Sequence, residues 1–140
     1  MFDVFGNERL IKWKEFREYL ETADDPCQSV VDLWIRAPFV NAFLDHQNPG
    51  SWPDPWHLVL DDRIDQLAIV LGMLYTLKLT RRFIDSEYEI HMSIIGDRSP
   101  DFFLVIDGYV LNFEYGSAKP IEHFDNLRGS KIIFSGKELP

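Results

Sequence analysis

The spacing of apolar residues changes along the chain, from the helical repeat of three to four residues to the alternation that is typical of strands. From Glu8 to Glu21 the helical repeat predicts an amphipathic helix. A second helix is predicted from Pro26 to about Arg36, because Asp25 can cap its first turn and Pro38 disfavours helical geometry at the residue before it.

The longest apolar stretch predicts a central helix from about Asp62 to Leu79. It is apolar on nearly all sides, as is typical of a helix that other elements cover. Gly72 in its interior costs about 1 kcal/mol relative to alanine, so we expect a close backbone approach at that point. The adjacent Asp61 and Asp62 are predicted to cap this helix, because carboxylates stabilise the free amides of a first turn.

The second half of the chain has the pattern of strands. Residues 88 to 94 alternate apolar and polar side chains and predict a half-buried strand, whereas Phe102 to Ile106 is apolar on both faces and predicts an interior one. Asp107 and Gly108 predict a type I′ hairpin turn, followed by a strand through Tyr115. A short strand is expected from Lys131 to Phe134.

Together these elements predict one α+β domain over residues 1–140, with N-terminal helices and a central buried helix packed on a C-terminal antiparallel β-meander. At 140 residues and 46% apolar content, the chain can bury a core without disulfides or metals. Its net charge of −9 repels phosphate backbones and anionic membranes, so we expect neither nucleic acid nor a membrane as partner. The first residues lack the pattern of a signal peptide.

Cys27, the single cysteine, is one candidate for catalysis. It lies in the first turn of a predicted helix, where the helix dipole and free amides stabilise a thiolate, although Asp24 and Asp25 oppose this. The alternative is that Cys27 is a small residue packed at a helix start.

His91 is the second candidate, with carboxylates that could orient its ring. Glu89 shares the polar face of its strand, Glu114 lies on the polar face of another, and Asp107 lies in the hairpin turn. A histidine oriented by a carboxylate is the usual skeleton of a general base or a metal ligand. The alternative is a surface histidine among solvated acids.

The sequence predicts no metal site and no cofactor. His46, His57 and His123 lack the spacing of metal ligands, and there is no CxxC pair. A glycine-rich phosphate loop and a GxSxG elbow are also missing from the sequence.

The segment DHQNPGSWPDPW, from Asp45 to Trp56, is stiffened by three prolines. Trp52 and Trp56 are the candidates for a partner-binding surface, because tryptophan on a rigid loop loses little entropy on docking. The alternative is that both indoles cover the central helix.

Two resemblances add to this interpretation. The run APFVNAFLDHQNPGSWPDPWHLVLDDRIDQLAIVLGMLYTLKLT, from Ala37 to Thr80, resembles short uncharacterised proteins encoded by T4-like phages of marine cyanobacteria. This resemblance implies a biological setting rather than a reaction, and it implies a place in the host cytoplasm or in the virion.

The predicted order of elements is also similar to the transglutaminase-like and papain-like core. In that family a cysteine opens the central helix, a histidine lies on a following strand and an aspartate on the next. His91 matches the histidine, and Asp107 or Asn112 the third position. The residues from Asp61 to Asp65 include no cysteine or serine, so the resemblance implies a pseudoenzyme or a reused scaffold.

The leading hypothesis is therefore a non-catalytic, phage-type accessory or structural protein that binds another protein. The competing hypothesis is a small hydrolase-like or transferase-like enzyme that uses His91 with a nearby carboxylate, and Cys27 from elsewhere in the fold. A third is a small-molecule binding module between the main helix and the sheet. The sequence does not set the oligomeric state.

Overall fold

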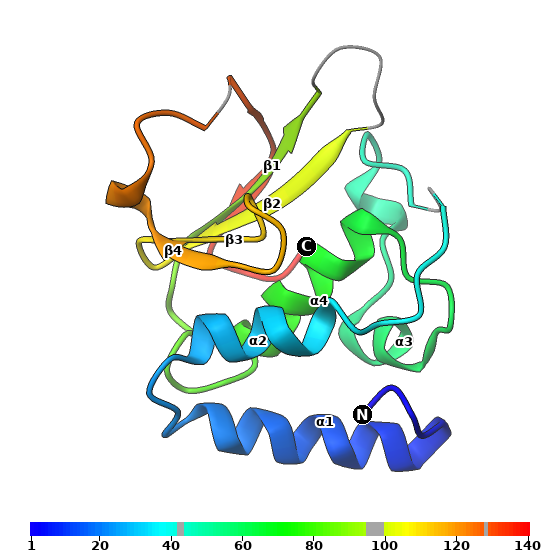
Figure 1. The fold of residues 1–140 in the computed structure, drawn as a ribbon. Coiled ribbons are helices and arrows are strands. Elements are labelled where there is room, and N and C mark those ends of the chain that lie inside the picture. Colours follow the sequence, from blue (N-terminus) through cyan, green and yellow to red (C-terminus); the bar gives the residue numbers. More distant parts are fainter. Residues whose placement is uncertain (42–43, 95–99, 128) are drawn as a thin grey trace.

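A computed structural model describes residues 1–41, 44–94, 100–127 and 129–140. The α-helices are α1 (Gly6–Leu20), α2 (Pro26–Trp34), α3 (Pro55–Leu60) and α4 (Gln66–Lys78). The strands are β1 (Tyr88–Ser93), β2 (Asp101–Ile106), β3 (Tyr109–Leu111), β4 (Ala118–Pro120) and β5 (Lys131–Gly136). Figure 1 shows α2 and α4 between the sheet and α1.

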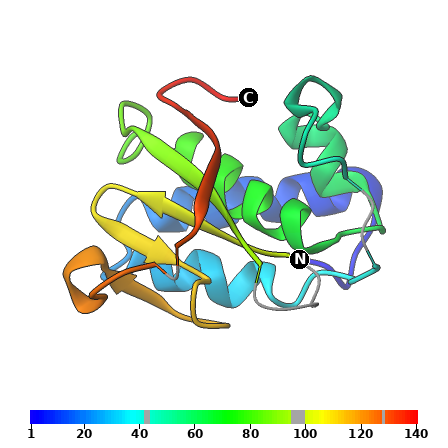
Figure 2. The same ribbon diagram turned by 90° about the horizontal axis from the view of Figure 1, so that it is seen from above.

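The predicted α+β class, with helices first and strands second, is confirmed. The sheet is antiparallel with the order β4-β3-β2-β1-β5, so β1, β2 and β3 form the predicted meander and β4 extends it. The fifth strand does not continue it, because β5 returns across the molecule to pair with β1 (Figure 2). This places β1 and β2 in the interior of the sheet.

One helix start follows the prediction, and another does not. The Asp25 side chain caps α2 by accepting a hydrogen bond from the backbone N–H of Gln28, as predicted. The start of α4 is capped by Asp65, which accepts from the N–H of Ala68, and not by Asp61 or Asp62. The prediction was wrong because α3 ends at Leu60, so that these two acids belong to the connection between the helices.

The core between helices and sheet is organised around the hydroxyl of Thr76 on α4. The indole N–H groups of Trp13 on α1 and Trp34 on α2 each donate to Thr76 Oγ1 over 2.9 Å. The hydroxyl in turn donates to the backbone carbonyl of Gly72. All three side chains are fully buried, so this hydroxyl satisfies two donors that have no access to water.

Gly72 is the point of close approach that the sequence predicted. A Cβ atom there would lie 2.4 Å from the Trp34 ring. The group that approaches is therefore the indole of Trp34, and it packs directly on the backbone of α4. Alanine at this position would force α2 away from α4.

The hairpin after β2 is confirmed, but the following strand is shorter than predicted. Asp107 and Gly108 have φ values of 52° and 77°, as a type I′ turn requires. β3 ends at Leu111, because Asn112 adopts the left-handed region with φ 67° and its side chain accepts from the N–H of Gly116. The chain then turns back into β4, which the sequence pattern did not reveal, and Tyr115 lies in this turn.

In the part of the chain that the structure describes, no helix is long and apolar enough to cross a membrane.

We expect Thr76→Val to destabilise the fold strongly, because it leaves two buried indole N–H groups without an acceptor. Each unsatisfied donor costs about 1–3 kcal/mol. Thr76→Ser is the matched control, since it keeps the hydroxyl and loses one methyl group, which is worth about 1 kcal/mol. Urea unfolding of the three proteins measures the difference, and equal stabilities of the valine and serine variants would show that the hydroxyl is not required.

Candidate functional site

The candidate site is a cleft where the helix layer meets one end of the sheet. A hollow of about 590 Å³ lies between the C-terminal end of α2, the first turns of α4, the start of β2 and the turn after β3. Its lining residues are Ile35, Phe39, Gln66, Ile69, Asp101, Phe102, Asn112, Phe113, Glu114 and Tyr115. A second hollow of about 430 Å³ adjoins it and shares Phe39, Gln66 and Phe102.

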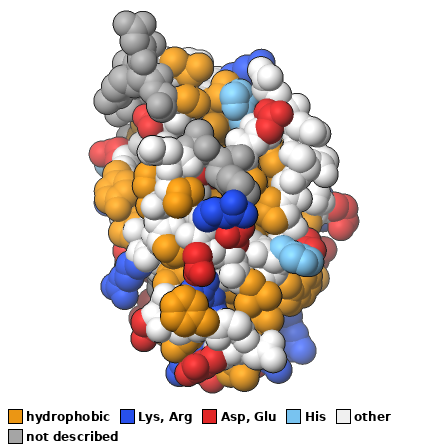
Figure 3. All heavy atoms as spheres, turned by 90° about the vertical axis from the view of Figure 1, so that its right-hand side faces the viewer, with side chains coloured by type: hydrophobic (Ala, Val, Ile, Leu, Met, Phe, Trp, Pro, Cys, Tyr) orange, Lys and Arg blue, Asp and Glu red, His pale blue; other side chains and the backbone are white. Residues whose placement is uncertain are grey.

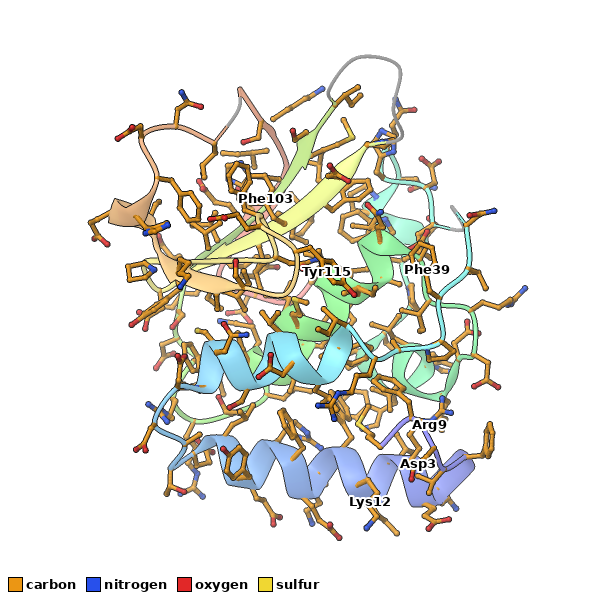
Figure 4. All side chains as sticks on the ribbon, viewed as in Figure 1. Asp3, Arg9, Lys12, Phe39, Phe103 and Tyr115 are labelled. Carbon is orange, nitrogen blue, oxygen red and sulfur yellow. The ribbon has the colours of Figure 1, made fainter. Side chains whose placement is uncertain are left out.

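Two aromatic side chains form the outer walls of this cleft. Figure 4 shows Phe39, from the segment after α2, and Tyr115, from the turn after β3, on the same side of the molecule. Their exposed fractions are 55% and 79%, which is high for aromatic rings. The floor between them is apolar and consists of the largely buried side chains of Ile69 and Phe102.

The backbone holds both walls in place. Residues 38–40 pair with Ile64, since the N–H of Val40 donates to the Ile64 carbonyl and the N–H of Ile64 donates to the Pro38 carbonyl. The turn that carries Tyr115 is closed by the Asn112 side chain and by a backbone bond from Asn112 to Ser117. The Gln28 side chain of α2 also donates to the carbonyl of Gly116 in this turn.

The charged groups of the cleft are acidic. Asp101 and Glu114 are exposed at its rim, and no lysine or arginine is among its described lining residues. The Glu114 carboxylate lies 3.8 Å from His123 Nε2, a long and exposed contact. Glu114 therefore does not orient His91, as the sequence suggested it could, but belongs to the cleft.

His91 lies on the other face of the sheet, away from the helices. Its ring stacks on Phe103 with the centroids 4.8 Å apart, and the side chain is 7% exposed. The turn and loop after β3 cover this face with Phe113 and Phe124, whose rings are in contact. The alternative of a surface histidine among solvated acids is therefore wrong.

Both ring nitrogens of His91 have partners. Nε2 lies 3.0 Å from Glu89 Oε1, and Nδ1 lies 2.8 Å from Ser130 Oγ. A carboxylate only accepts hydrogen bonds, so Nε2 carries a proton that it donates to Glu89, whereas either Nδ1 or the Ser130 hydroxyl can be the donor in the second bond. The structure thus joins His91 to Glu89, as predicted, and adds Ser130.

Cys27 and Asp107 do not join this group. Cys27 packs in the core on the helix side of the sheet, opposite to His91. Burial, and then the nearby Asp25 and Asp107 carboxylates, raise the pKa of the Cys27 thiol to about 12, so it is protonated near neutral pH. Of the two interpretations of Cys27, the structure supports a small packed residue.

The structure separates the two loop tryptophans. Trp52 is 8% exposed, its indole N–H donates to the Asp45 carbonyl, and its ring contacts Phe134. It is therefore part of the core and offers no surface to a partner. Trp56 is 48% exposed and touches Trp13 edge-on.

On the side of the molecule that carries α3, apolar side chains are interspersed with charged ones (Figure 3).

Comparison of the chain with protein-family models, with curated proteins and with solved structures gave no match. The geometry and charge of the site are therefore the main guide to its function. Among the described residues, no group of three or more histidine, cysteine or acidic side chains is placed to hold a metal ion.

The sequence did not reveal the residues that define the cleft. Phe39 stands beside a proline and outside the predicted elements, and the alternation of side chains placed Tyr115 in a predicted strand rather than in a turn. Ser130 also went unnoticed, because 39 residues separate it from His91. The one available signal was Asn112 followed by Gly116, because asparagine and glycine tolerate the left-handed conformation that turns require.

We expect Trp52→Ala and Trp56→Ala to differ in stability. The first removes a buried indole and is expected to cost about 3–5 kcal/mol, whereas the second removes a half-exposed ring and one edge contact, worth about 1 kcal/mol. Urea unfolding followed by far-ultraviolet circular dichroism gives both values. Equal losses would contradict the assignment of Trp52 to the core and Trp56 to the surface.

Proposed function

We propose that the chain is a non-catalytic accessory or structural protein that binds a positively charged segment of another protein in the cleft between Phe39 and Tyr115. The observation that carries this proposal is the pair of exposed aromatic rings over an apolar floor. Aromatic side chains are enriched in the centres of protein interfaces, where they contribute most of the binding energy.

The rigidity of the cleft supports binding. Phe39 and Tyr115 extend from backbone that is hydrogen-bonded on both sides, so docking orders little that is not already ordered. The two adjoining hollows, of about 590 and 430 Å³, fit neighbouring side chains of one extended segment. A small molecule of similar volume is the alternative occupant.

Charge indicates the sign of the partner. The net charge of the chain is −9, and the rim of the cleft carries Asp101 and Glu114. A positively charged segment would be steered towards this surface, whereas a second copy of the chain would be repelled. The resemblance to cyanophage-encoded proteins, which implies no reaction, agrees with an accessory role in the host cytoplasm or the virion.

The proposal is tested by selecting a random peptide library on the immobilised protein and measuring the affinity of the selected peptides. We expect Phe39→Ala and Tyr115→Ala each to weaken binding about ten-fold or more, because each removes one wall of the cleft. Tyr19→Ala is the matched control, since Tyr19 is an exposed aromatic residue on α1 outside the cleft. All three residues are exposed, so the variants should remain folded.

Two outcomes would refute binding of a partner segment in the cleft. The selection could yield no binders, or the selected peptides could bind the Phe39→Ala and Tyr115→Ala variants as tightly as the original protein. If Trp56→Ala abolished binding instead, the partner would bind at α3, which carries Trp56, and not in the cleft.

The chain of hydrogen bonds from Ser130 through His91 to Glu89 favours a second candidate function, a hydrolase. In it Ser130 Oγ attacks an acyl carbon while His91 Nδ1 takes the hydroxyl proton, and the leaving group departs with that proton. Glu89 stabilises the imidazolium through Nε2–H. The nearest hollow, of about 440 Å³, includes Glu89 but neither His91 nor Ser130 among its described lining residues, so we rank this candidate second.

A fluorophosphonate probe tests the second candidate, because it reacts with activated serines. The hydrolase hypothesis expects covalent labelling at Ser130 that disappears in Ser130→Ala and falls strongly in His91→Gln. Ser135→Ala is the control, since Ser135 is an exposed serine of β5 outside this hydrogen-bonded chain. Intact-mass measurement that finds no adduct on the original protein would reject a catalytic serine.

A further inference from the structure

We infer that the cleft recognises one cationic side chain of its partner, an arginine or lysine, between the rings of Phe39 and Tyr115 and beside the carboxylates of Asp101 and Glu114. This inference rests on the proposed function, because it assigns the chemical group that the cleft selects. The four side chains come from three separate segments, the one after α2, the start of β2 and the turn after β3, and they line one hollow.

The ring faces of Phe39 and Tyr115 are available to a ligand. Within the described part of the chain, neither ring stacks on another aromatic ring, whereas Phe102 and Phe113 below them contact His46 and Phe103. The face of an aromatic ring carries partial negative charge and attracts a cation that lies within about 6 Å of the ring centre. Arginine suits such a site best, because its planar guanidinium is weakly hydrated and stacks on rings.

The carboxylates of Asp101 and Glu114 attract a cation in addition to the two rings. The Asp101 side chain is exposed and makes no hydrogen bond or ion pair within the described residues, and the Glu114 carboxylate has only its long contact with His123 there. Each exposed pair with a cation is worth little by itself. Together with two ring faces in the same hollow, however, they favour a cation over a neutral side chain of equal size.

The protein already uses this combination for one of its own arginines. The guanidinium of Arg9 lies 5.7 Å from the centre of the Phe2 ring and 5.3 Å from that of the Phe5 ring. Its Nη2 donates to the Asp62 carboxylate over 3.2 Å, and the side chain is buried (Figure 4). Two rings and a carboxylate therefore suffice to hold a guanidinium in this fold when backbone carbonyls complete its hydrogen bonds.

Amide side chains in the cleft can bind the main chain of the partner segment. Its described polar lining includes the side chains of Gln66 and Asn112, and Gln66 is exposed. An amide side chain can bind the main chain of an extended segment on either side of the arginine or lysine that lies between the two rings. Apolar neighbours of that residue would then meet the floor at Ile69 and Phe102.

A matched pair of peptides tests the inference. Acetyl-Leu-Arg-Leu-amide and acetyl-Leu-citrulline-Leu-amide have nearly the same shape, but citrulline is uncharged and has a carbonyl acceptor where arginine has a donating NH2 group. Titration of ¹⁵N-labelled protein with each peptide, followed by NMR chemical shifts, gives both dissociation constants and the residues affected. We expect the arginine peptide to bind about ten-fold more tightly and to shift the amides of Phe39, Asp101 and Tyr115.

Variants separate the ring contribution from the carboxylate contribution. Tyr115→Phe should keep the preference for arginine, whereas Tyr115→Leu, which keeps apolar surface but has no ring face, should reduce it several-fold. The double change Asp101→Asn and Glu114→Gln should also reduce the preference several-fold, and added salt should weaken binding. Glu15→Gln on α1 is the control for general loss of negative charge.

The results distinguish this inference from the proposed function. If both peptides bind equally and both lose affinity on Phe39→Ala, the cleft is a neutral apolar site. The cation inference is then overturned while peptide binding stands. If neither peptide shifts cleft residues at millimolar concentration, the cation inference is also overturned, and the library selection decides separately whether the cleft binds any segment.

Discussion

The hydroxyl of Thr76 receives hydrogen bonds from the indoles of two different helices, and the arrangement of all three helices depends on it. Trp13 brings α1 and Trp34 brings α2 to one point on α4. The absence of a side chain at Gly72 lets the Trp34 ring lie directly on the α4 backbone. Because Trp34 is the last residue of α2, this contact also fixes where Ile35 and the segment to Phe39 leave the helix, and so it places one wall of the cleft.

The sheet divides the molecule into two chemical environments. On the helix side, burial keeps the Cys27 thiol protonated and inert. On the other side, the chain after β3 folds back over β1 and β2 and encloses His91 with Phe103, Glu89 and Ser130. Cys27 and His91, which the sequence suggested as nucleophile and base, therefore lie on opposite faces of the sheet. The cleft lies at one end of the sheet, between α2, α4, the start of β2 and the turn after β3.

Acidic charge and exposed aromatic rings have one common consequence for this cleft. Negative charge at the rim attracts a cation from a distance, and ring faces act only at contact. The same pairing holds Arg9 inside the protein with Phe2, Phe5 and Asp62. We propose that the cleft offers a partner the same kind of site that holds Arg9 at one end of α1.

Local sequence determined the positions of α1, α2 and α4, the cap at Asp25 and the hairpin at Asp107, because each depends on backbone preferences and burial within a few residues. Gly72 indicated a close approach, but only the tertiary structure showed that Trp34 is its partner. The tertiary structure alone decided the pairing of β5 with β1, the burial of Trp52, the contact of His91 with Ser130 and the meeting of Phe39 with Tyr115. These contacts join residues that are far apart in the chain or depend on how a loop is covered. The free energy of these contacts comes from packing between elements, and the spacing of residues along one element does not predict which elements pack together.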